Sequence, residues 1–287
     1  MKTLPVLVAG VCLLLSACQP NTFPDLKDAL TFYVSFDNGT SADFARGDGE
    51  MYTAIATYAN GRRSLDSVRV GMHNANHQLV EGGGLTGDAF AFGDKSGPVL
   101  FYNGKDNIVY NPENWSGTIS FWLSVDPAAD IDGYTDPIQI TDTDFNDASI
   151  WVDFTDADPT DFRLGVIGDR SAWTQDTVHT PVREVFEKRI LNVGQYPFSR
   201  AEWTHVLISY DGLGTTNSLA TLYLDGEKMG EVSDIDDPFT WTLDNSKIFL
   251  GLGFRGVMDE LSIFNKPLTD EQVLALFELK GGIKSIL

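Results

Sequence analysis

The sequence GLGFRGVMDELSIFNKPL occupies residues 251–268 and decides the fold. From Val257 to Phe264 its character alternates with a period of two, which is typical of a β-strand. One face carries three aliphatic side chains and a carboxylate, namely Val257, Leu261, Ile263 and Asp259. The other face carries Met258, Glu260, Ser262 and Phe264. A carboxylate among aliphatic side chains is costly unless it accepts hydrogen bonds or binds a cation, so Asp259 needs a partner.

The residues after this strand predict its end and a closing helix. Pro267 ends the strand because proline cannot donate a hydrogen bond to a neighbouring strand. Thr269 and Gln272 have the spacing of a capping box, which opens a helix. Apolar residues then recur at helical spacing, so a short helix is predicted over residues 270–279.

Short alternating segments precede this strand about every ten residues, with turn residues between them. The first is 30–36, and a strong one is 117–125. The clearest hairpin turn is Asp225-Gly226, between segments 220–224 and 227–232. This spacing predicts one antiparallel all-β sandwich over residues 30–287, rather than alternating strands and helices. Residues 41–84 have little periodicity, and we expect only short edge strands there, such as 77–80.

The N-terminus has the features of a secretion signal. Lys2 precedes an apolar run over residues 5–15, which is too short to span a membrane comfortably. The following Leu-Ser-Ala-Cys, ending at Cys18, resembles the lipobox of bacterial lipoproteins. The resemblance implies a signal peptide over residues 1–17, lipidation of Cys18 and a tether over residues 18–29. The alternative is an ordinary signal peptide in which Cys18 is incidental.

A lipidated Cys18 implies a location in the cell envelope, at the outer membrane or in the periplasm and cell surface. Several acyl chains on one cysteine give stable anchoring. Gln19 rather than aspartate after the cysteine favours the outer membrane, if the cell has one.

Composition narrows the function further. The formal net charge of −21 argues against nucleic-acid partners and suits a secreted protein or cation binding, although solubility alone is the alternative. The two cysteines are Cys12, inside the signal, and Cys18. The mature domain would therefore have no thiol, which excludes disulfides and cysteine catalysis within it.

Four motifs resemble one known family in their order along the chain. They are YVSFDNG at 33–39, GTISFWL at 117–123, WTHV at 203–206 and GVMDELSIFNKPL at 256–268. Together they resemble the concanavalin A-like lectin/glucanase superfamily, in its laminin-G-like branch, which is common in bacterial surface proteins. The resemblance implies a jelly roll of one concave and one convex antiparallel sheet.

The same resemblance implies a structural calcium ion near the first and last strands. Its ligands would be Asp37 and Asp259, with main-chain carbonyls around Asn38 and Gly39. Calcium prefers several oxygen ligands, and Asp259 needs a partner. The alternative is that Asp37 caps a turn and Asp259 accepts main-chain hydrogen bonds.

A sugar-binding surface needs aromatic faces beside carboxylate and amide groups. Two tryptophans lie near such groups in the sequence. The candidate ligand-binding residues are Trp151, Asp153, Asp169, Arg170, Trp173 and Gln175. The alternative is that both tryptophans belong to the core.

No catalytic signature is present in the sequence. The superfamily's glucanases carry a strand with paired acidic residues for retaining hydrolysis, and no such run occurs here. We therefore expect a surface or periplasmic lipoprotein that binds glycans or another extracellular ligand without catalysis. A divergent glycoside hydrolase or polysaccharide lyase is one alternative, and a protein–protein adhesion or scaffold module is another. Two close carboxylates in the concave groove would favour the enzyme.

Overall fold

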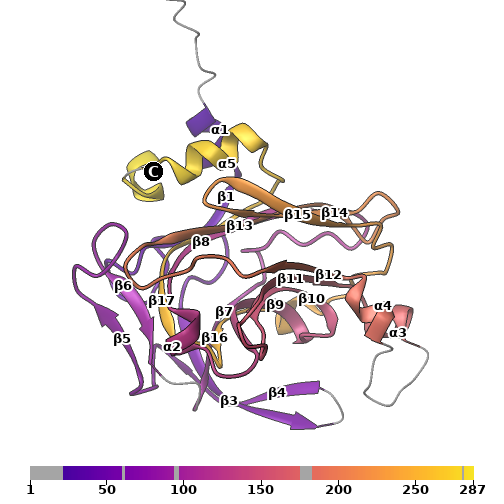
Figure 1. The fold of residues 1–287 in the computed structure, drawn as a ribbon, viewed down its shortest axis with the longest axis horizontal. Coiled ribbons are helices and arrows are strands. Elements are labelled where there is room, and N and C mark those ends of the chain that lie inside the picture. Colours follow the sequence, from indigo (N-terminus) through magenta and orange to yellow (C-terminus); the bar gives the residue numbers. More distant parts are fainter. Residues whose placement is uncertain (1–21, 60–61, 94–96, 175–182, 280) are drawn as a thin grey trace, which may run out of the picture.

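Two antiparallel sheets stack face to face in the computed structural model of this chain (Figure 1). The structure describes residues 22–59, 62–93, 97–174, 183–279 and 281–287. Strand pairs in both sheets are antiparallel. The predicted all-β jelly-roll sandwich with a short C-terminal helix is confirmed.

The first sheet has nine strands, in the order β15-β14-β13-β8-β17-β1-β2, with β6 beside β17 and β5 beside β6. These are β1 (Leu30–Val34), β2 (Phe44–Ala45), β5 (His77–Val80), β6 (Ala89–Phe92), β8 (Trp115–Ser124), β13 (Thr204–Leu213), β14 (Leu219–Leu224), β15 (Glu227–Ser233) and β17 (Gly256–Phe264). The predicted hairpin joins β14 to β15. Asp225 and Gly226 both have positive φ, 50° and 79°, as its tight turn requires.

The second sheet has eight strands, in the order β12-β11-β10-β9-β16-β7-β3-β4. They are β3 (Met51–Ala59), β4 (Arg62–Val70), β7 (Val99–Asn103), β9 (Thr135–Asp144), β10 (Asp147–Phe154), β11 (Phe162–Ile167), β12 (Ile190–Gly194) and β16 (Lys247–Leu252). Alternate residues of β9 and β10, such as Ile140 and Val152, are fully buried in the core between the sheets. The residues between them face outward, which gives this sheet a polar outer face.

The alternation predicted for β17 is wrong at its centre, because a β-bulge interrupts it. The register with β8 shifts after Asp259, and Glu260 has a φ of 54°. Met258, predicted on the opposite face, therefore packs in the inter-sheet core together with Leu261 and Ile263. Asp259 does not share a face with those two aliphatic residues.

Helices α1 (Thr22–Ala29) and α5 (Asp270–Phe277) and the 3-10 helix η2 (Ile283–Ile286) cover the outer face of the nine-stranded sheet (Figure 1). The capping box of Thr269 and Gln272 at the start of α5 is confirmed. The structure has helix α1 in the described part of the predicted tether. Leu26 and Ala29 lie on one face of that helix and are buried in the apolar cluster with α5.

Short helices occupy several of the remaining connections. They are α2 (Pro127–Asp130), α3 (Arg170–Trp173), α4 (Arg183–Glu187) and η1 (Leu243–Asn245). No helix within the described ranges is both long enough and apolar enough to cross a membrane. The predicted signal peptide and Cys18 lie outside the described residues.

Hairpin β3–β4 is the largest departure from the predicted fold. The sequence predicts only short edge strands in residues 41–84, whereas β3 and β4 have nine residues each. Most of β4 is exposed, so no alternation between buried and exposed positions marks it in the sequence. The hairpin lies at the edge of the eight-stranded sheet and supplies one wall of the groove described next.

Candidate functional site

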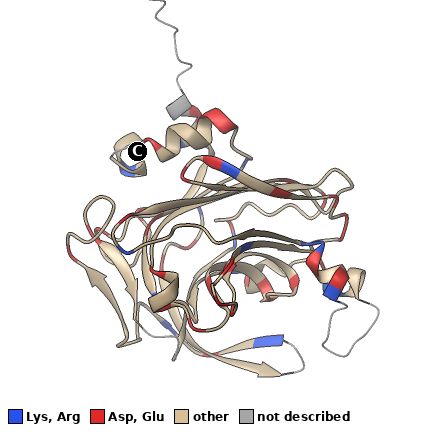
Figure 2. Cartoon of the chain, in the orientation of Figure 1, with Lys and Arg blue, Asp and Glu red and all other residues tan. Residues whose placement is uncertain are grey.

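A groove of about 870 Å³ lies on the outer face of the eight-stranded sheet. Its floor is formed by outward-facing residues of β9, β10 and β11, chiefly Gln139, Trp151, Asp153 and Arg163. Hairpin β3–β4 lines one side of it, and helix α4 contributes to the lining as well. Acidic residues are spread over the molecule, and hairpin β3–β4 is one of the few basic segments (Figure 2).

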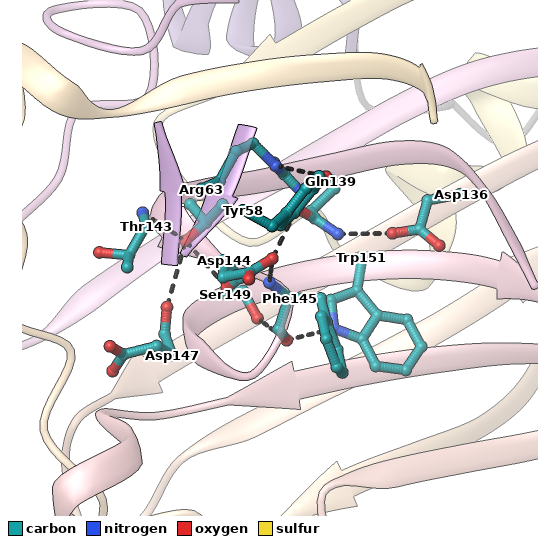
Figure 3. A network of polar contacts seen from close by, with 11 residues as sticks. Tyr58, Arg63, Asp136, Gln139, Thr143, Asp144, Phe145, Asp147, Ser149 and Trp151 are labelled. Atoms are coloured by element: carbon teal, nitrogen blue, oxygen red, sulfur yellow. Dashed lines mark hydrogen bonds and ion pairs between the residues drawn. The ribbon is translucent and has the colours of Figure 1, made fainter. Parts of the chain in front are cut away.

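A chain of polar contacts ties the hairpin to the floor (Figure 3). Arg63 Nη2 on β4 donates to Gln139 Oε1 at 2.7 Å and lies 3.3 Å from Asp144 Oδ1. Gln139 Nε2 in turn donates to Asp136 Oδ2 at 2.5 Å. The Arg63 guanidinium also stacks on the ring of Phe249, 4.3 Å from its centroid. Arg63 is therefore the side chain that joins the groove's wall to its floor.

A second ion pair lies farther along the floor. Arg163 binds the carboxylate of Asp153 through two nitrogens, at 2.9 and 2.5 Å. The Asp153 side chain is only 5% exposed. The same guanidinium lies 5.2 Å from the ring centroid of Tyr134 and 5.6 Å from that of Trp151. This bidentate pair holds Asp153 in a fixed position.

Three aromatic side chains of the groove are open to solvent. Tyr58, Tyr134 and Phe145 line it and are 61%, 58% and 42% exposed. They come from β3, from the residue just before β9 and from the turn between β9 and β10. Exposed rings around a polar floor are the arrangement in which an apolar sugar face can stack while its hydroxyls form hydrogen bonds.

Phe145 is held in place through its main chain (Figure 3). Its N–H donates to Asp144 Oδ1 at 2.9 Å, and its carbonyl accepts from Trp151 Nε1 at 2.8 Å and from the Ser149 hydroxyl. Its ring meets that of Phe186 edge-on, 6.3 Å between centroids. The turn therefore presents this ring to the groove in one orientation, although the ring itself is exposed.

Burial raises the pKa of two carboxyl groups of the floor, those of Asp136 and Asp153. Burial, together with the nearby Asp153 carboxylate, raises the pKa of Asp136 to about 8, against the opposing effect of Arg63. Burial also raises the pKa of Asp153, while its bond to Arg163 lowers it. Asp136 is thus the floor carboxyl that can hold a proton near neutral pH, beside one that is paired with a cation.

Two of the predicted ligand residues line this groove, Trp151 and Asp153. Trp151 is 2% exposed, and its indole covers Gly165, where an added Cβ would lie 2.2 Å from the ring. It therefore supports the floor more than it offers an open face. Gly165 on the neighbouring strand is what allows the ring to lie flat there.

Asp169, Arg170 and Trp173 do not line the groove. Trp173 is 7% exposed and packs with Trp151 in a buried cluster beneath α4. Asp169 Oδ1 accepts from the Thr240 main chain at 2.7 Å, and the Arg170 N–H donates to Asp147. The burial of both tryptophans agrees with the alternative that they are core residues. Gln175 lies outside the described residues.

The predicted calcium ligands lie on either side of residues 84–88. Asp259 is fully buried, and its oxygens accept from the main-chain N–H groups of Leu85 at 2.7 Å and Glu260 at 2.8 Å. Asp37 accepts from the Asp88 N–H at 2.9 Å and pairs with Lys284, also at 2.9 Å. The contacts of Asp259 agree with the alternative without a metal, whereas Asp37 bonds to Asp88 and Lys284 rather than capping its own turn.

The surroundings of Asp259 nevertheless suit a cation. Burial, with the neighbouring Glu260 carboxylate, raises the pKa of Asp259 to about 8, and no ion pair to it is found among the described residues. The side chain of Asn38 donates to Asp43, so it does not face Asp259. Gly39 lies in the turn after Asp37, with a φ of 108°. No three acidic, histidine or cysteine side chains converge within the described residues, so most ligands would be main-chain or water oxygens.

The sequence does not predict the three exposed rings or the hydrogen bonds that link Arg63, Gln139 and Asp136. Tyr58 and Arg63 lie in the segment without periodicity, and Gln139 reads as an ordinary outward position of a strand. The one available signal is Phe145, an aromatic residue in an acidic turn, where water rather than core surrounds most side chains.

A family model supports this architecture independently. Residues 103–274, more than half of the chain, match the model for the concanavalin A-like lectin/glucanases superfamily. The chain belongs to this superfamily. The predicted family is therefore confirmed, and the groove lies on one sheet of its two-sheet sandwich.

Solved structures of other domains share the fold of this chain at low sequence identity. Domain 4 of AbnA, a GH43 extracellular arabinanase from Geobacillus stearothermophilus solved in complex with arabinotriose, matches with a TM-score of 0.52 and 17% identity, over 87% of this chain and 98% of that one. The botulinum neurotoxin serotype D binding domain matches with a TM-score of 0.55 and 15% identity, over 90% of this chain. This chain spans about half (52%) of that toxin domain. No curated protein matches the sequence significantly.

Proposed function

We propose that this chain binds glycans in the groove of the eight-stranded sheet, without catalysis, as a lipoprotein of the cell envelope. The observation that carries the proposal is the set of three exposed rings, Tyr58, Tyr134 and Phe145, around a floor of carboxylate, amide and guanidinium groups. Rings of this kind stack on sugars, and the polar floor can bind hydroxyl groups.

Two comparisons support a binding role. The arabinanase domain was solved with arabinotriose, and the toxin domains are named as binding domains. They share only the fold with this chain, so the argument rests on the groove's own side chains. The bidentate bond between Arg163 and Asp153 also favours binding over catalysis, because a carboxylate held in this way is a poor nucleophile or base.

The first test replaces the exposed rings. Phe145→Ala and Tyr134→Ala should each weaken binding to a recognised polysaccharide about tenfold, since truncation of an aromatic anchor costs more than ~1 kcal/mol. Affinity electrophoresis against a panel of plant, algal and bacterial polysaccharides, followed by calorimetry, measures this effect.

Phe44→Ala is the matched control for these variants. Phe44 is a similarly exposed aromatic residue, but it lies on β2 of the other sheet. Unchanged binding in the groove variants, or loss in the control, would contradict the assignment. Binding of a protein and of no polysaccharide would favour the adhesion-module alternative.

A glycoside hydrolase is the second candidate, and Asp136 is the observation that favours it. A carboxyl whose pKa is raised to about 8 can act as a general acid, and the Asp153 carboxylate lies in the same groove. If the chain is such an enzyme, incubation with a bound polysaccharide should release reducing ends. Asp136→Asn should then lower the rate by about 10²–10⁴ while binding persists. We expect no release from the parent chain, and sustained release would overturn the non-catalytic proposal.

We also propose that calcium binds between Asp37 and Asp259. A carboxyl whose pKa is raised on folding stabilises the fold at low pH, and this contribution is lost as the pH rises towards the raised value. In chelator, the free energy of unfolding should therefore fall from about pH 4 to about pH 8, with Asp136 contributing in the same direction. Calcium should restore stability at the upper end, because it binds the ionised Asp259.

Asp259→Asn separates this calcium effect from general stabilisation. The variant should show a shallower pH dependence of its urea-unfolding midpoint and no gain from calcium. Asp136→Asn serves as the control, because it should keep the gain. Equal midpoints for the parent chain in calcium and in chelator at pH 8 would count against the calcium site.

The envelope location rests on Cys18 and the apolar run before it. Three residues lie between Cys18 and Thr22, where α1 begins, so the four peptide steps would hold the domain within about 14 Å of the lipid. In a bacterial host, the parent chain should incorporate labelled fatty acid and sediment with membranes. Cys18→Ser should abolish both. A parent chain that stays unlabelled would leave an ordinary secreted protein.

A further inference from the structure

We propose that the groove selects uncharged glycans and rejects glycans that carry carboxylate or sulfate groups. This inference rests on the proposed function, because it names the class of glycan that the same groove binds. It follows from how the charged side chains of the groove are paired.

Every described cationic side chain of the lining already has a carboxylate partner. The lining contains three arginines and four acidic residues, and no lysine within the described residues. The pairs are Arg63 with Asp144, Arg163 with Asp153, and Arg183 with Glu187. The described part of the lining therefore offers no spare cation to an anionic sugar.

Two of these ion pairs are buried, so separating their partners costs free energy. The side chains of Arg63 and Asp144 are 4% and 6% exposed, and those of Arg163 and Asp153 are 17% and 5% exposed. An anionic ligand that took over either arginine would leave a buried carboxylate without its counter-ion. Breaking a buried pair in this way is strongly unfavourable.

Two further groups, Arg63 Nη1 and the Arg183 side chain, do not change this conclusion. Arg63 Nη1 has no hydrogen-bond partner among the described residues, but this atom is itself buried and so presents no open donor to the groove. Arg183 is 90% exposed at the rim and pairs with Glu187 one helical turn away. A ligand anion that approached Arg183 would also meet the charge of Glu187.

Asp136 is the fourth acidic residue, and it faces the ligand space without an arginine bond. It accepts a hydrogen bond from the Gln139 amide, and the Asp153 carboxylate lies nearby. A sugar hydroxyl can donate to Asp136 when it is ionised and accept from it when it is protonated. Above about pH 8, where Asp136 is ionised, a sugar carboxylate would instead be repelled by Asp136 and by Asp153.

Pairs of polymers that differ mainly in charge test this selectivity. Methyl-esterified polygalacturonate against polygalacturonate, and plain xylan against glucuronic acid-substituted xylan, keep the backbone type while adding carboxylates. At pH 9 and low salt, we expect the acidic member of each pair to bind at least about tenfold more weakly, because ionised Asp136 and a sugar carboxylate a few Å apart repel by more than ~1.4 kcal/mol. Added salt should narrow the difference.

Asp136→Asn tests whether the groove's own charge is the cause. At pH 9, where Asp136 of the parent chain is ionised, this variant should narrow the difference within each pair, whereas Glu113→Gln, at an exposed acidic residue outside the groove, should leave it unchanged. Equal or tighter binding of the acidic polymers by the parent chain would overturn this inference and leave the glycan-binding proposal standing. Binding of neither member of any pair, across the full panel, would overturn both.

Discussion

The tie between Arg63 and the floor of the eight-stranded sheet is the contact on which the site depends. Hairpin β3–β4 packs little apolar surface, since most of β4 is exposed. Arg63 therefore positions it by bonding to Gln139 and Asp144 and by stacking on Phe249. The guanidinium is buried and charged, and a buried charge without its partners costs free energy. Its position is therefore fixed by Gln139, Asp144 and Phe249.

The remaining polar contacts of the groove give it rigidity before any ligand arrives. The side chains of Ser149 and Trp151 donate to the main-chain carbonyl of Phe145 and fix the turn that carries it, and Arg163 holds Asp153 while its guanidinium lies near two aromatic rings. A surface ordered in this way loses little conformational entropy on binding. Trp151, a predicted ligand-binding residue, is buried and supports the turn that carries the exposed Phe145 ring. This role differs from stacking on a ligand.

The sequence predicts what depends on local periodicity, and it does not predict what depends on contacts between distant segments. The sandwich, the Asp225-Gly226 hairpin and the capping box of α5 follow from spacing of two, from turn chemistry and from helix capping. The bulge at Glu260 interrupts the period of two, so the sequence pattern predicts Met258 on the wrong face of its strand. Arg63 and Gln139 are 76 residues apart, and neither carries a local signal of their bond. Trp151 and Asp153 reach the groove because strand alternation alone turns them outward.

The most direct test of this account maps where a recognised oligosaccharide contacts the domain. Nuclear magnetic resonance titration of the isotope-labelled chain reports this as chemical-shift changes for each residue. The account predicts that the changes cluster on the outer face of the eight-stranded sheet, at Tyr58, Tyr134, Phe145, Gln139 and their neighbours. Changes centred on the outer face of the nine-stranded sheet, under α1 and α5, would contradict it.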